Sequence, residues 1–170
     1  MKNIKQLLII IAITLSLMSK GQITTSTLSV AQYVTNVLLG PGVTASGITY
    51  TGLPRMIASF TAPTSTNLGL KKGVYLTCGS NGTIAGELGP AGPSSLFQSV
   101  DQNQPGDASL TALSGIGTND AAVLEFDFIP QSDTIKFRYV FGSEEYNDYV
   151  NSINDAFAFI LSGVSTPLAA

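Results

Sequence analysis

The chain has no histidine, no tryptophan and only one cysteine among its 170 residues. Without imidazole it can form no Ser-His-Asp or Cys-His nucleophile system and no His-ligated zinc site. One cysteine excludes an intrachain disulfide and a site of several thiolates. Charged residues are also scarce, at 11% of the chain. These absences exclude most common enzyme chemistries, and the length allows one domain of ordinary size.

What is present begins with an export signal. Two lysines precede an apolar run from Leu7 to Met18, and the small residues Ser19 and Gly21 follow at the two positions that a signal peptidase reads. The run is shorter than the roughly 20 apolar residues that cross a bilayer. We therefore expect residues 1–21 to be a signal peptide that is removed. The mature domain of residues 22–170 would be secreted or held at the cell surface, with no membrane span.

The charge of the mature chain is negative and unevenly distributed. Removal of the signal peptide leaves five basic against 11 acidic side chains, a balance that disfavours nucleic acid as a partner. Ten of the 11 acids lie between Asp101 and Asp155, where the only bases are Lys136 and Arg138. This asymmetry is the main chemical signal of the sequence.

Short apolar runs separated by turn residues predict a mainly β fold, which we expect to be a jelly-roll-like β-sandwich. One packed N-terminal helix is predicted over residues 30–39, because Ser29 and Gln32 fit a capping box and Gly40 a helix stop. A short second helix should begin after Asp107, as its N-cap. The expected strands span residues 43–51, 56–61, 74–78, 122–129, 134–141 and 156–161.

Two of these strands predict a hairpin around the loop at residues 130–133. In the register that this loop sets, Asp127 would oppose Lys136 and Glu125 would oppose Arg138, so that ion pairs occupy both bases of the acidic half. The other face would bring together the apolar side chains Leu124, Phe126, Phe128, Ile135, Phe137 and Tyr139. Residues 156–161 are apolar at every position, as expected of a central strand.

The loop at residues 142–155 has many carboxylates and amides but no cation. Carboxylates gathered in this way repel one another unless they are solvated or neutralised. Their irregular spacing suits the flexible oxygen coordination of Ca²⁺ better than that of Mg²⁺. The alternative is a solvated acidic loop. The candidate metal ligands are Glu144, Glu145, Asp148, Asn154 and Asp155, with Asp107 as either a distant ligand or a helix cap.

A pair of carboxylates could also serve a polysaccharide-active hydrolase, with Asp107 or Glu144 as the acid and Glu145 or Asp155 as its partner. Glu144 and Glu145 are adjacent, however, and adjacent side chains of an extended chain point to opposite faces. Tryptophan, the usual platform for a sugar ring, is absent. The residues therefore favour a protein that is not an enzyme, and no catalytic residue is assigned.

Several segments together resemble one family. The similar stretches read VTNVLLGPGVTASGITYTG, NLGLKKGVYLTCGS, GDASLTALSG, TNDAAVLEFDFIP and FRYVFGSEEYNDYVNSINDAFAFILSG. They resemble the choice-of-anchor L domain of secreted bacterial proteins, which is frequent in Bacteroidetes, and the likeness covers nearly all of residues 29–163. The last stretch is long and distinctive.

The resemblance implies an exported β-rich surface or extracellular module without an enzymatic activity. Family members end in one of several alternative anchoring or sorting signals, including those of type IX secretion. They usually continue through further strands beyond the point where this sequence ends, so we expect a C-terminally truncated domain. The expected function is attachment (adhesion) or ligand contact, with Ca²⁺ as a stabilising ion and an extracellular polysaccharide or a surface protein as the partner. The alternatives are the hydrolase and a purely structural matrix protein.

Overall fold

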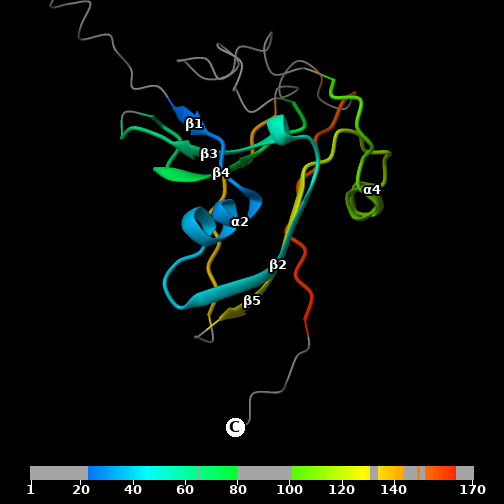
Figure 1. Cartoon of the computed structure of the whole chain (residues 1–170). Coiled ribbons are helices and arrows are strands. Elements are labelled where there is room, and N and C mark those ends of the chain that lie inside the picture. The colour runs from blue at the N-terminus through cyan, green and yellow to red at the C-terminus, as the bar shows by residue number, and fades with distance from the viewer. Residues whose placement is uncertain are drawn as a thin grey trace, which may run out of the picture.

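A computed structural model describes residues 23–64, 66–79, 101–130, 134–143, 149 and 152–163. Most of the regular structure is strands in antiparallel sheets, accompanied by two short helices (Figure 1). This agrees with the predicted mainly β class. The jelly-roll order of strands stays a prediction.

The strands form two sheets. β1 (Thr24–Ser26), β3 (Ile57–Thr61) and β4 (Lys72–Leu76) make a three-stranded antiparallel sheet in the order β1-β3-β4. β2 (Val43–Thr51) pairs with β5 (Val123–Pro130) in a second antiparallel sheet. The β2 strand has the bounds that its turn residues predict, and the bounds of β3, β4 and β5 differ from the prediction by one or two residues.

The N-terminal helical turns begin at the predicted capping box, where Ser29 and Gln32 exchange side-chain to backbone hydrogen bonds. Only α2 (Val30–Gln32) is α-helical, and the chain continues as the π-helix η1 (Tyr33–Leu38). The Thr35 hydroxyl donates to the carbonyl of Ala31 at 3.0 Å. Such a bond competes with the regular helical ladder, which gives a physical reason for the wider turns.

The second predicted helix is present as α4 (Ala108–Ser114). Asp107 caps it, because one carboxylate oxygen accepts the amide of Leu110 at 2.9 Å. Gly115 ends it with φ 73°, a left-handed conformation that glycine adopts without steric cost. Asp107 is thus a helix cap, which is one of the two roles predicted for it from the sequence.

The core lies between η1 and β3. Its fully buried side chains are Tyr33, Val34 and Met56, and Ile57, Ala58 and Ala62 complete it. The short 3₁₀ helix η2 (Pro54–Met56) leads Met56 into this core. The Tyr33 hydroxyl accepts the amide of Leu28 and donates to the carbonyl of Ile57, so the buried phenol has partners on both sides. Figure 1 shows the blue helical turns lying against the small sheet.

The predicted strands at residues 134–141 and 156–161 are wrong, since both segments lack regular strand structure. The hairpin register is wrong with them. β5 pairs with β2, which places Asp127 opposite Ser46 and Glu125 opposite Thr49. Within the described residues, no ion pair joins these acids to Lys136 or Arg138. The physical reason is that an apolar alternation predicts which side chains share a side but not which backbones pair, and residues 134–143 and 154–163 contact each other through their aromatic rings.

Candidate binding surface

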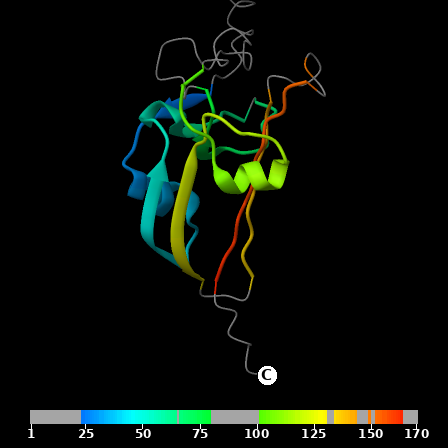
Figure 2. The same ribbon diagram turned by 90° about the vertical axis from the view of Figure 1, so that its right-hand side faces the viewer.

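Two segments of the C-terminal half form the most distinctive surface of the molecule. Phe137 stacks on Phe159 with ring centroids 5.2 Å apart, and Tyr139 stacks on Phe157 at 5.4 Å. From Phe137 to Tyr139 the first segment advances by two residues, and the stacking partner on the second segment moves back by two residues, from Phe159 to Phe157. Residues 134–143 and 154–163 therefore run antiparallel, side by side, as the golden and red traces of Figure 2 show.

The side chains that share a side with these rings form what we call the aromatic face. Alternation along an extended chain assigns every second residue to it. The five aromatic residues are 45–61% exposed, and Ile135 and Leu161 at the ends are 39% and 71% exposed. By this alternation its one charged side chain is that of the half-buried Asp155, at the end next to Phe141. The other members of the face are Ile135, Phe137, Tyr139, Phe141, Phe157, Phe159 and Leu161.

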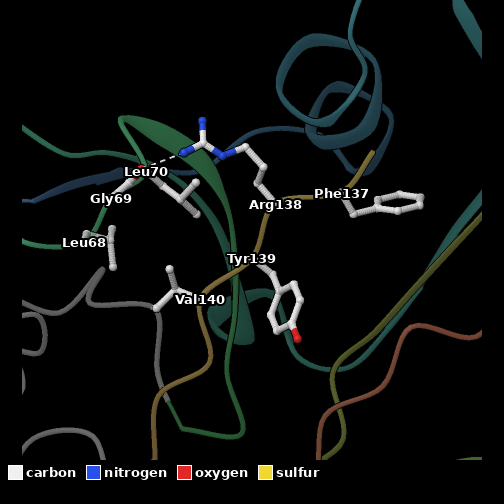
Figure 3. Close-up of a pocket in the computed structure, with 7 residues that line it drawn as sticks. All are labelled: Leu68, Gly69, Leu70, Phe137, Arg138, Tyr139 and Val140. Carbon is white, nitrogen blue, oxygen red and sulfur yellow. Dashed lines mark hydrogen bonds between the residues drawn. The ribbon is translucent and has the colours of Figure 1, made fainter. Parts of the chain in front are cut away.

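The opposite side of the same segment forms a groove with the loop at residues 68–70. Arg138 and Val140 extend toward this loop, whereas Phe137 and Tyr139 extend away from it (Figure 3). One terminal nitrogen of Arg138 donates to the carbonyl of Gly69 at 3.3 Å. The groove has a volume of about 380 Å³. Its lining consists of Leu68, Gly69, Leu70, Arg138 and Val140 together with Phe137 and Tyr139.

Cations gather around this groove. Of the five basic residues after residue 21, Arg138 lines the groove and three others lie within two residues of a lining residue in the sequence, and all four are exposed. No acidic side chain comes within ion-pair distance of them in the described part of the chain. The cations that the sequence assigned to cross-strand pairs are therefore available to a ligand. These four residues are Lys71, Lys72, Lys136 and Arg138, and with the groove they form what we call the basic groove.

A smaller pocket of about 150 Å³ lies between the β2-β5 pair and the loop before α4. Asp107 and Glu125 both line it. The Asp107 carboxylate caps α4, and the backbone of Asp107 exchanges two hydrogen bonds with the Thr118 hydroxyl at 3.1 Å each. These contacts explain Asp107 as a structural residue.

A hydrogen-bonded loop that the sequence did not predict borders this pocket. The Asp120 carboxylate accepts the amides of Gln102 and Gln104 at 2.9 and 2.7 Å. The buried side chain of Gln102 in turn accepts the Nε–H of Arg55. Arg55 is the fifth cation of the mature chain, and this contact gives it a structural role apart from the basic groove. No local sequence motif predicts these bonds, because the partners of Asp120 lie 16 and 18 residues away.

The pKa of Tyr50 is clearly perturbed. Burial of the phenol, together with the neighbouring Tyr33, raises the pKa of Tyr50 from 10.0 to about 12. Its hydroxyl donates to the carbonyl of Leu53 at 3.0 Å. The phenol stays protonated at physiological pH and serves as a donor that fastens the turn after β2.

The predicted metal ligands are only partly described. Glu144, Glu145 and Asp148 lie outside the described residues. Asn154 is exposed and Asp155 is half-buried at the start of the second aromatic segment. No group of three or more Asp, Glu, Cys or His side chains able to hold a metal occurs within the described ranges. The calcium site stays a prediction.

Antiparallel sheets with two short helices define a β-rich domain. The chain belongs to the choice-of-anchor L domain family, whose model matches residues 22–169. Membership implies a secreted or surface protein and a domain that is not an enzyme. No curated protein and no solved structure matches the chain. Among the described residues, none of the helices has the length and apolar character that crossing a membrane requires.

Proposed function

We propose that this domain is an exported, non-catalytic attachment module that holds an acidic extracellular polysaccharide in its basic groove. The observation that supports this function is the position of the cations. In an acidic chain, Arg138 lines the groove and three more of the five mature cations lie within two residues of its lining in the sequence. The family supplies the setting, a surface or secreted domain without catalysis.

The walls and the guanidinium of the groove suit such a ligand. Leu68, Leu70 and Val140 offer aliphatic contact to the carbon faces of sugar rings. The bond from Arg138 to Gly69 holds the guanidinium in place and leaves further N–H donors for a carboxylate, which arginine binds in a bidentate manner. The acidic remainder of the molecule repels a polyanion, so that binding is confined to the basic groove.

Binding of the full chain to an immobilised polyuronate, with neutral dextran as the comparison, tests this function. We expect binding to the polyuronate alone, weakened by added salt because exposed charges are screened. Arg138→Ala should weaken it by roughly tenfold or more, the effect of losing a charge-assisted hydrogen bond.

Thr44→Glu is the matched control for charge. Thr44 is exposed on β2 and does not line the groove, and the substitution lowers the net charge by the same unit as Arg138→Ala. It should leave the affinity nearly unchanged. Equal binding to dextran, or an Arg138→Ala variant that binds as well as the parent, would reject the polysaccharide proposal.

A further inference from the structure

The aromatic face is large for the surface of a monomer. Five aromatic side chains, each about half exposed, leave on the order of 500 Å² uncovered if a ring residue presents about 200 Å². Ile135 and Leu161 extend this face at its end, to roughly 700 Å² in total. Monomeric proteins rarely expose a continuous apolar patch above a few hundred Å². A stable interface covers about 800 Å² on each partner, so the face has nearly the area that a dimer requires.

We propose that the aromatic face is a self-association surface, through which two copies of this chain pack face against face. The face is uncharged apart from Asp155 at one end, so two acidic molecules can approach each other there with little repulsion. A two-fold contact uses the same patch on both copies, which requires a surface complementary to itself. A set of rings and aliphatic ends fulfils this requirement, because few of its groups need a specific hydrogen-bond partner.

The arrangement of the rings argues against a sugar as the occupant of this face. Phe137 with Phe159, Tyr139 with Phe157, and Phe141 with Phe157 are stacked at interplanar angles of 29°, 30° and 27°. The rings thus cover much of one another's faces, whereas a sugar platform needs a free ring face. Mutually stacked rings with aliphatic ends suit the apolar packing of one layer of β structure on another.

Phe137 and Tyr139 belong to both surfaces, but self-association at this face leaves the Arg138 side of the groove accessible. Arg138 and Val140 extend to the opposite side of the segment from Phe137 and Tyr139 (Figure 3). A dimer would therefore present two basic grooves, pointing away from the shared interface. If the proposed polysaccharide function holds, two linked sites on a repeating polymer would raise the apparent affinity by avidity without any new contact.

Sedimentation equilibrium of the full chain, expressed for export and followed over about a hundredfold range of concentration, tests the proposal. The parent should sediment as a dimer that dissociates on dilution, with a melting midpoint that rises with protein concentration. Phe159→Glu places a charge at the centre of the face and should give a monomer whose midpoint no longer depends on concentration. Tyr139→Lys, on the other segment, should do the same and serves if the first variant fails to fold.

Ile160→Glu is the matched control. Ile160 is 64% exposed and adjacent to Phe159, but alternation directs it to the opposite side. This variant should remain a dimer. A parent that is monomeric throughout the range, or an Ile160→Glu variant that dissociates as readily as Phe159→Glu, would overturn the proposal. Binding to the polyuronate by a monomeric parent would leave the proposed function intact, so the two failures can be distinguished.

Discussion

At the scale of single residues, the loop before α4 depends on a close approach that only glycine permits. A Cβ added to Gly106 would overlap the backbone carbonyl of Thr118. We expect Gly106→Ala to lower the free energy of unfolding by about 1–3 kcal/mol, as overpacking of a tight contact does. Urea denaturation of the parent and the variant measures the difference.

Gly117 provides the control for this prediction. It lies just after α4, and a Cβ built there meets no atom within 4 Å. Gly117→Ala should be neutral or raise the free energy of unfolding by about 0.4–1 kcal/mol, because alanine restricts the unfolded chain. Equal effects at the two glycines would show that the approach of Gly106 to Thr118 does not constrain the folded state.

The sequence predicts single residues well where their partners are local. Asp107 caps the helix that begins at the next residue, and the Ser29 capping box closes over three residues. Asp120 is the opposite case, since it accepts amides 16 and 18 residues earlier in the chain. Spacing rules for caps and turns extend over four or five residues, so a bond of that reach leaves no recognisable pattern.

At the scale of elements, α4 depends on its cap because it has only seven residues and no buried side chain. Asp107→Ala removes the acceptor of the Leu110 amide and should lower the free energy of unfolding by about 1 kcal/mol. Asp107→Asn keeps an acceptor oxygen and should lower the free energy of unfolding by only about a few tenths of a kcal/mol. Thermal melting of both variants checks the order. A similar loss in both would indicate that the carboxylate charge, and not the cap, is what the fold requires.

Elements were predictable from sequence where turn residues bound them. β2 lies between Gly42 and Gly52, and its predicted range matches the structure. Polar and apolar side chains alternate along most of residues 134–141, and residues 156–161 are apolar throughout. Neither segment has regular strand structure. An apolar pattern predicts which side chains share a side, and the stacked rings bear this out, but it does not determine which backbone pairs with which. For the same reason the assignment of Lys136 and Arg138 to cross-strand pairs was wrong, and the basic groove was missed.

At the scale of the whole molecule, one pair of segments supports two different surfaces. The side that carries Arg138 faces the loop at residues 68–70, whereas the side that carries Tyr139 is aromatic and apolar apart from Asp155 at one end. This separation follows from alternation along an extended chain. Ligand attachment and self-association can therefore be changed independently by substitutions at neighbouring positions, which is why Arg138 and Phe159 are tested separately.

The distribution of charge over the whole chain also predicts a response to calcium. The acids of the C-terminal half have few nearby cations, because the basic residues of that half lie at the groove and not opposite Glu125 and Asp127. A bound Ca²⁺ would relieve the repulsion among them and stabilise the folded state by about 2.7 kcal/mol at a hundredfold excess over its Kd. We expect the melting midpoint of the full chain to be higher in calcium than in chelator, with magnesium giving a smaller rise.

Two matched substitutions distinguish a site from general screening of negative charge. Asp155→Asn removes one charge from the predicted ligand set, and Asp101→Asn removes one charge from an exposed acid outside it. The Asp101 carboxylate accepts the amide of Asn103, a bond that asparagine retains. The calcium-dependent rise should shrink in Asp155→Asn and persist in Asp101→Asn, because only the first lies among the predicted ligands. A midpoint that is the same in calcium and in chelator would remove the metal from this molecule and leave the loop at residues 142–155 as a solvated acidic segment.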